Sequence, residues 1–135
     1  MSLMEDCIFC QIIAGKSSKY LVDEDADFMA FLDINPINRG HTLVIPKVHH
    51  RWVHQVEKFG PYWEVAKRVA QAQIQALKAD HVNFATLGYG NSHAKIHVIP
   101  RYIGDDLGDF IDWTKSKALL EHEMEEVARS LTASI

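Results

Sequence analysis

The chain has 135 residues, 47% of them hydrophobic, and a formal net charge of −4 at pH 7. This length suits a single domain, 1–135, and the acidic balance argues against a general binder of polyanions such as nucleic acids. No stretch is long and apolar enough to span a bilayer, and residues 1–6 lack the basic and apolar regions of a secretory signal. Two cysteines, Cys7 and Cys10, are too few for a disulfide framework, which indicates a reducing, cytoplasmic setting.

The first half of the chain is predicted to be rich in strands, because short apolar runs alternate with turn residues. Gly15 ends a short helix, Pro36 and Gly40 break regular structure, and Pro46 closes a central strand. The expected elements are a short helix at 11–15, strands at 19–24, 28–32 and 41–46, a turn at 25–27, a loop at 33–40, and a loop with one helical turn at 47–57.

The second half contains the two long helical patterns. Pro61 suits the first turn of one helix, and Ser116 can cap the other. The expected elements are helices at 62–79 and 116–130, strands at 83–87 and 93–100 that form a hairpin, and an irregular acidic stretch at 101–113. Together these elements predict an α+β domain: a five-stranded, mostly antiparallel sheet with one long helix and a C-terminal helix.

Residues 93–98 alternate polar and apolar side chains, which is the period of a half-buried strand. His93, Lys95 and His97 then point to one face of the strand, while the three apolar residues between and after them enter the core. Three nitrogen-bearing side chains in a row repel one another once protonated. This face is therefore expected to meet a metal, an anion, or both.

Several segments together resemble the histidine triad (HIT) family. Its signature is His-x-His-x-His followed by apolar residues and often Pro-Arg, so His97 matches the third histidine, Lys95 the second and His93 the first. The resemblance is carried by residues 7–10, 31–34, 40–47, 49 and 93–101. It implies a HIT-like fold. The chain departs from the family at Lys95, where the family has its nucleophilic histidine, and in the loop at 83–93, which is shorter and lacks glutamine.

In zinc-containing HIT proteins, a Cys-x-x-Cys pair and two histidines hold the metal. The matching positions are Cys7, Cys10, His49 and His93, and Zn²⁺ favours such a closed set of four ligands as a structural site. A buried pair of inert thiols and a redox Cys-x-x-Cys are the alternatives, and the latter favours a βαβ context that is absent from the predicted elements. His50 competes with His49 as a ligand, but the Pro-Lys-x-His spacing favours His49.

The resemblance also implies a pocket for a purine nucleotide or a related phosphate ligand. A carboxylate at a strand end can accept both ribose hydroxyls, although Asp33 alone would read as a turn residue. His97 is expected near the phosphate, and Asn91 and Ser92 partly substitute for the missing loop residues. The predicted nucleotide-binding residues are Phe31, Asp33, Ile34, His41, Ser92 and His97. The tryptophans at 52, 63 and 113 are expected to pack or to form interfaces.

Lys95 sets the expected chemistry. The family forms a covalent nucleotidyl-histidine and then hydrolyses it. A lysine can attack phosphorus only when its amine is neutral. With an unperturbed pKa, only about one lysine side chain in a few thousand is neutral at pH 7. We therefore expect a zinc-stabilised nucleotide-binding protein whose hydrolase activity is weak or lost. The alternatives are an active nucleotide hydrolase or nucleotidyl transferase, with Lys95 or His97 as nucleophile, and a dimeric interaction module with a vestigial pocket. A homodimer is expected through the helix at 62–79, which carries apolar residues on more than one face.

Overall fold

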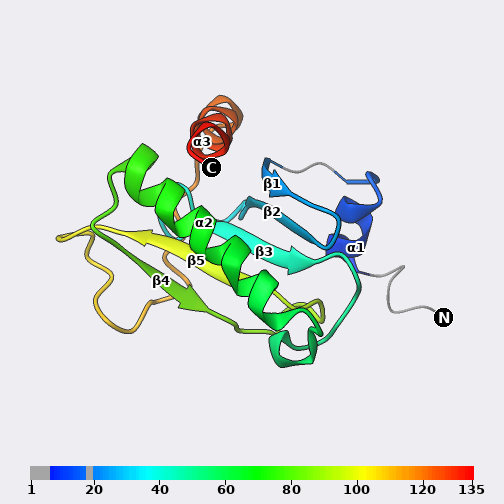
Figure 1. Cartoon of the computed structure of the whole chain (residues 1–135). Coiled ribbons are helices and arrows are strands. Elements are labelled where there is room, and N and C mark those ends of the chain that lie inside the picture. The colour runs from blue at the N-terminus through cyan, green and yellow to red at the C-terminus, as the bar shows by residue number, and fades with distance from the viewer. Residues whose placement is uncertain (1–6, 18–19) are drawn as a thin grey trace.

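The computed structural model describes residues 7–17 and 20–135, and these residues form the predicted α+β architecture (Figure 1). In this part of the chain the strands make one five-stranded antiparallel sheet in the order β1-β2-β3-β5-β4. The elements are α1 (Ile8–Ile13), β1 (Leu21–Glu24), β2 (Phe28–Leu32), β3 (Thr42–Pro46), a 3-10 turn (Val53–Gln55), α2 (Phe59–Leu77), β4 (His81–Ala85), β5 (Ile96–Arg101) and α3 (Glu121–Ala133). None of the helices described has the length and hydrophobicity of a membrane span. The expectation about a secretory signal concerns residues 1–6, which lie outside the described residues.

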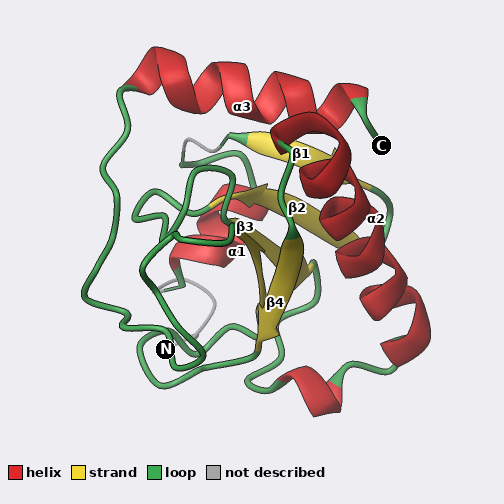
Figure 2. Cartoon of the chain, turned by 90° about the vertical axis from the view of Figure 1, so that its left-hand side faces the viewer, coloured by secondary structure: helices red, strands yellow, loops and turns green. Residues whose placement is uncertain are grey.

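The sheet is covered on both faces, which is why β2, β3 and β5 are buried along their whole length. Helices α2 and α3 lie on one face, and α1 lies on the other (Figure 2). Alternate residues of β2 separate accordingly: Ala30 packs under α2 and α3, whereas Phe31 packs under α1. A cavity lies on the α1 face, between α1 and the sheet, so this is the face on which a site can form.

A buried glutamine fixes the centre of the sheet. Gln73 of α2 donates from Nε2 to the carbonyl oxygens of Gly40 (3.0 Å) and Val98 (2.9 Å). Gly40 has φ +98° and packs so closely that a Cβ there would collide with Leu77, so both its backbone and the available space require glycine. These contacts hold the chain entering β3 against β5, where Leu43 pairs with His97.

The segment around His93 is the first correction to the predicted elements. The hairpin strand begins at Ile96 rather than His93, because β5 pairs with β3 only as far as Val44, and β3 itself ends at Pro46. The predicted orientation of the apolar side chains is correct nevertheless, because Ala94, Ile96 and Val98 enter the core beneath α2. All six residues from 93 to 98 are buried, so the strand is not half-buried as predicted.

The C-terminal helix is the second correction, since it begins at Glu121 rather than after Ser116. The backbone N–H of Lys117 donates to the carbonyl oxygen of Pro36 (2.6 Å), which keeps this stretch extended across the molecule. The Glu123 carboxylate instead accepts from the Leu120 N–H (2.9 Å) at the start of α3. The loop at 33–40, the strand at 28–32 and the single turn within 47–57 occur as predicted.

Candidate functional site

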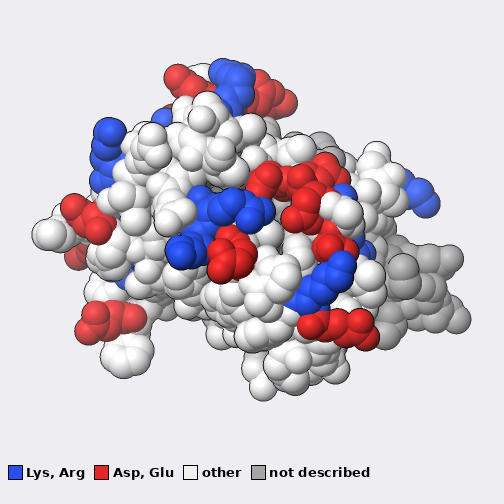
Figure 3. Space-filling model, viewed as in Figure 1, with Lys and Arg blue, Asp and Glu red and all other residues white. Residues whose placement is uncertain are grey.

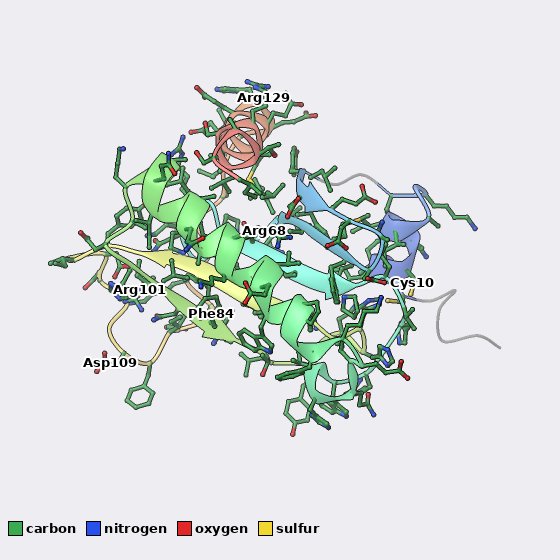
Figure 4. All side chains as sticks on the ribbon, viewed as in Figure 1. Cys10, Arg68, Phe84, Arg101, Asp109 and Arg129 are labelled. Atoms are coloured by element: carbon green, nitrogen blue, oxygen red, sulfur yellow. The ribbon has the colours of Figure 1, made fainter. Side chains whose placement is uncertain are left out.

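A cluster of two thiols and two imidazoles joins α1 to the segment after β3 and to the loop before β5. Cys7 precedes α1 and Cys10 lies in its first turn (Figure 4), so the helical turn brings both sulfurs to one side. The Cys10 Sγ lies 3.2 Å from His49 Nδ1 and 3.5 Å from His93 Nδ1, and Cys7 Sγ lies 3.4 Å from His93 Nδ1. All four ligand atoms are within 4.8 Å of one another. These are the four predicted positions, and His50 is not in the cluster.

The His93 ring is oriented as a ligand. Its Nε2 lies 2.7 Å from the carbonyl oxygen of Pro46, an acceptor, so Nε2 carries the hydrogen and the Nδ1 lone pair faces the two sulfurs. Burial lowers the pKa of His93 to about 4, which keeps the ring neutral at pH 7. Burial, with help from Cys7, raises the pKa of Cys10 to about 12. An ion in this cluster must therefore displace a thiol proton.

The spacing of the cluster fits a tetrahedral ion. With Zn–S about 2.3 Å and Zn–N about 2.0 Å, neighbouring sulfur and nitrogen ligands of a tetrahedral centre lie roughly 3.5 Å apart. The three sulfur–nitrogen separations above, 3.2 to 3.5 Å, are close to this value. Two thiolates and two imidazoles are a donor set that zinc favours, and the set is closed, with no position supplied by water.

A cavity of about 840 Å³ opens beside this cluster, between α1, the end of β2, the loop before β5 and the segment after β5. Its walls combine apolar side chains with a carboxylate, an ammonium and an imidazole, which is the usual make-up of a small-molecule site. The residues that line it include Phe9, Phe31, Asp33, Ile34, Asn91, Lys95, His97 and Trp113.

Asp33 has two roles in this geometry. Its Oδ1 accepts from the backbone N–H of Asn35 (2.8 Å), which forms the turn that its sequence context alone predicts. Its Oδ2 makes no hydrogen bond to the described residues and lies 3.6 Å from His41 Nε2. Burial raises the pKa of Asp33, while the Asn35 N–H and the charge on Lys95 oppose that shift. One carboxylate oxygen thus stays available to a ligand.

Lys95 lies on the wall of the cavity and is only 7% exposed. Its ammonium donates to the carbonyl oxygen of Asn91 (3.0 Å) and lies 5.6 Å from the centre of the Phe9 ring, within cation–π range. Burial lowers the pKa of Lys95 and Arg51 adds to that effect, whereas Cys7 and Asp33 oppose it. The side chain is therefore held by protein contacts at the cavity and does not extend into solvent.

His97 and His41 form a chain of hydrogen bonds behind the cavity. The backbone N–H of Ile37 donates to His41 Nδ1 (3.0 Å), and His41 Nε2 lies 2.9 Å from His97 Nδ1. His97 lines the cavity, whereas His41 is fully buried and does not. Burial lowers the pKa of His41 to about 3 and that of His97 to about 4, so both rings are neutral at pH 7.

The structure places the other predicted pocket residues less uniformly. Phe31 and Ile34 line the cavity, and Ile34 is 72% exposed there. Ser92 does not line it, whereas Asn91 does. Asn91 Oδ1 accepts from the His93 N–H (2.8 Å), which holds the loop in a turn at this point.

Sequence reasoning missed Trp113 as a wall of the cavity. The irregular segment after β5 crosses back over the sheet, and the Trp113 ring centre lies 4.8 Å from that of His97 and 6.1 Å from that of His41. An ion pair between Arg101 and Asp105 (2.7 Å) anchors the start of this segment. A tryptophan in an acidic, irregular stretch was the available signal, but nothing local shows where such a stretch folds back.

Comparisons with known proteins agree with this fold. A family model described as the HIT domain matches residues 14–104. An uncharacterized HIT-like protein of Borreliella burgdorferi is 40% identical over 78% of this chain and 82% of its own length. The crystal structure of a zinc-bound histidine triad protein from Mycobacterium smegmatis has a TM-score of 0.78 and 32% identity, covering 97% of this chain and 94% of that one. A hypothetical histidine triad nucleotide-binding protein from Sulfolobus tokodaii has a TM-score of 0.81 and 30% identity, covering 95% and 91%.

Proposed function

Since this chain belongs to the HIT domain family, we propose that it binds a purine nucleotide or a related phosphate ligand in the 840 Å³ cavity. The observation that carries this proposal is the convergence of Asp33, Lys95 and His97 on one cavity with apolar walls. A carboxylate suits ribose hydroxyls, and an ammonium beside an imidazole N–H suits a phosphate. The direct test is titration of the metal-loaded protein with AMP in a calorimeter. No binding at millimolar AMP would refute the proposal.

We further propose that Cys7, Cys10, His49 and His93 hold a structural zinc ion. The sulfur–nitrogen separations and the Nε2–H of His93 on Pro46 support this assignment. Such an ion ties α1 to the strand end at Pro46 and to the loop before β5. Because α1 also forms one wall of the cavity, the metal would organise the binding site without contacting the ligand.

Asp33 provides a specific test of ribose recognition. The Asp33→Asn variant keeps the size of the side chain and an oxygen for the Asn35 turn but loses the charge. We expect it to weaken AMP binding about 10-fold, because hydrogen bonds to a charged acceptor contribute roughly 1.5–3 kcal/mol. Affinity for AMP and for its analogue lacking both ribose hydroxyls, 2′,3′-dideoxy-AMP, checks this in both proteins. Equal loss of affinity for both ligands would exclude ribose as the group that Asp33 contacts.

Lys95 leads us to propose that hydrolysis by the family route is weak or absent. The ammonium donates to Asn91 and rests on the Phe9 ring, which favours its charged form as a clamp for phosphate. The rival is a hydrolase or nucleotidyl transferase in which Lys95 is the nucleophile. The burial of Lys95, which lowers its pKa, favours that rival. The binding proposal and this rival differ in whether the protein turns over a nucleotide.

A homodimer through α2 and β4 is the fourth part of the proposal. Phe59, Ile74 and Phe84 are each 45–47% exposed on these elements, and Phe84 lies on β4 below α2 (Figure 4). The ring of Trp63 contacts Phe59 and Phe84, and its Nε1 is buried without an acceptor among the described residues. In Figure 3 charged side chains gather over α2, and the surface below them is largely uncharged. Val65 and Ala72 of α2 are buried in the chain's own core and so are not part of this exposed face.

The dimer proposal predicts that Phe84→Glu yields a monomer. A charge on this face would remain desolvated between two copies, which costs more than the contact contributes. Phe110→Glu is the matched control, because Phe110 is 95% exposed and lies in the segment after β5. Light scattering on the three proteins gives the mass. A monomeric wild type, or a Phe84→Glu variant that remains dimeric, would contradict the proposed interface.

A further inference from the structure

The Cys-x-x-Cys pair is arranged for a second chemistry besides metal binding. The Cys10 N–H donates to Cys7 Sγ (3.4 Å), and the two sulfurs lie 3.4 Å and 3.5 Å from the same atom, His93 Nδ1. Residues three apart in a helical turn have Cα atoms roughly 5 Å apart, within the range of about 4.4–6.8 Å that a disulfide spans. A bond between the two sulfurs therefore requires little movement of the backbone.

The two states of this pair connect different parts of the chain. With a metal in the cluster, α1 is tied to His49, 39 positions from Cys10, and to His93, 86 positions from Cys7. A disulfide between Cys7 and Cys10 instead closes a loop within one turn and connects α1 to nothing else. It also leaves no thiolate for an ion, and two imidazoles alone are not the four-ligand set of a structural zinc site. Oxidation would therefore replace a long-range cross-link with a local one.

The position of α1 on the sheet depends on its side chains. Among the described residues, the backbone–backbone hydrogen bonds of 7–16 are all made within this segment. Phe9 and Ile12 are buried in one apolar cluster with residues of β2 and β3, among them Phe31. These apolar contacts remain when the metal cross-link is lost. We therefore expect α1 to loosen on the sheet without leaving it, since a short helix held by few contacts opens more easily than the core.

Phe9 links the cluster to the cavity. It lies between the two cysteines in α1 and lines the cavity. Its ring centre lies 5.8 Å from that of His93 and 5.5 Å from that of Phe31, and the Lys95 ammonium lies 5.6 Å from it. A looser α1 would thus disturb an apolar wall of the cavity and the aromatic contact of its ammonium group.

We infer that Cys7 and Cys10 are an oxidation-sensitive modification site: a hydroperoxide converts the metal-binding pair into a disulfide, which releases the ion and loosens α1 as a wall of the cavity. The inference rests on the proposed zinc site, and its effect on a ligand rests on the proposed nucleotide cavity. Cys10 is partly exposed and Cys7 is only 4% exposed, so a small hydroperoxide reaches Cys10 first.

The hydroperoxide is the oxidant that the reaction consumes. The Cys10 thiolate attacks one peroxide oxygen, the O–O bond breaks, and hydroxide leaves, so that Cys10 becomes a sulfenic acid. The Cys7 thiolate then attacks the Cys10 sulfur, the S–S bond forms, the S–O bond breaks, and a second hydroxide leaves. Two thiolates, one hydrogen peroxide and two protons thus give one disulfide and two waters, and two electrons pass from sulfur to oxygen.

The first test is the addition of one equivalent of hydrogen peroxide to the zinc-loaded full chain. We expect one zinc ion per chain to pass to a chromophoric chelator, and the chain mass to fall by two hydrogens, which peptide mapping assigns to a Cys7–Cys10 disulfide. A dithiol reductant with added zinc is expected to reverse both changes. Zinc release without this disulfide, or zinc retained by the chain that carries it, would overturn the inference.

Hydrogen exchange of the α1 amides tests the loosening without any nucleotide. We expect these amides to exchange about 10-fold faster in the oxidised protein, while those of β3 and β5 are unchanged. Reduced His49→Ala, which lacks one ligand but keeps both thiols, is expected to show the same faster exchange in α1. His50→Ala is the matched control and is expected to behave as the wild type does. Unchanged α1 exchange in the oxidised wild type would overturn the inference.

AMP affinity in the two redox states separates this inference from the proposed function. We expect the oxidised protein to bind AMP about 10-fold more weakly, because one wall of the cavity is no longer preorganised. Equal AMP affinity in both states would overturn the inference and leave the nucleotide proposal standing. If zinc release and α1 exchange are as expected and neither state binds AMP, only the nucleotide proposal fails. A reduced protein that holds no zinc would refute the zinc proposal and this inference together.

Discussion

Replacing Lys95 with histidine is expected to create turnover of adenosine 5′-phosphoramidate and of a diadenosine polyphosphate, at a rate at least about 100-fold above that of the wild type. An imidazole is largely neutral at pH 7, whereas an unperturbed lysine is neutral about once in a few thousand molecules. The new side chain would begin from a backbone position that lines the cavity, two residues before His97. The measurement is AMP release by the zinc-loaded proteins, followed chromatographically.

Lys95→Ala is the control, since it removes the ammonium without supplying a nucleophile. Turnover by the wild type that disappears in Lys95→Ala would identify Lys95 as the nucleophile and contradict the binding proposal. Turnover by Lys95→His alone would mean that the cavity is intact and only the nucleophile is missing. Silence from all three proteins would favour the interaction module, because the loop before His93 would then fail to hold a phosphate for reaction.

The second large effect is expected at the metal cluster. His49→Ala removes one of four ligands from the ion that joins α1 to the sheet. Structural zinc contributes on the order of 10 kcal/mol to the folding of small metal-dependent domains, and losing one ligand removes part of that. We expect the free energy of unfolding to fall by about 3 kcal/mol and Tm by about 10 °C. Calorimetry on protein purified with zinc, with the metal content measured in parallel, gives both values.

His50→Ala is the matched control for this experiment. His50 is the next residue and is half-buried like His49, but its ring is not part of the cluster. Its side chain should therefore be dispensable, and its backbone carbonyl, which accepts from the Ala94 N–H (2.7 Å), is kept in the variant. An equal fall in Tm in both variants would contradict the assignment of His49. One zinc per chain retained by His49→Ala would contradict it as well.

Much of the fold follows from local patterns. A short apolar run beside turn residues predicts β2 at 28–32. Alternation at 93–98 places the side chains of Ala94, Ile96 and Val98 in the core, because neighbouring residues of an extended chain point to opposite faces. Helical spacing predicts α2, although its ends differ by two or three residues. The start of α3 was wrong, because the hydrogen bond from Lys117 to Pro36 joins positions 81 apart and no local pattern contains it.

Part of the candidate site could likewise be predicted from the sequence, and part of it could not. The candidate residues could be named from the sequence through the resemblance to the HIT family, whereas Asp33 by its type and local context alone reads as a turn residue. The sequence did not show that Trp113 lies beside His97, that Asn91 and not Ser92 lines the cavity, or that the Lys95 ammonium lies over the Phe9 ring. These features depend on contacts between segments that are far apart in the chain, or on a single turn of a loop.

The sequence by itself determined which donors and acceptors the protein possesses and on which face of a strand each one lies. Only the tertiary structure decided what each histidine does. A ring nitrogen is a donor or an acceptor according to the group facing it, and here those groups are the Pro46 carbonyl for His93 and the Ile37 amide for His41. Both are backbone groups, one 47 residues from His93 and the other four residues before His41. Backbone has the same chemistry at every residue, so the sequence does not show which of these groups faces a ring.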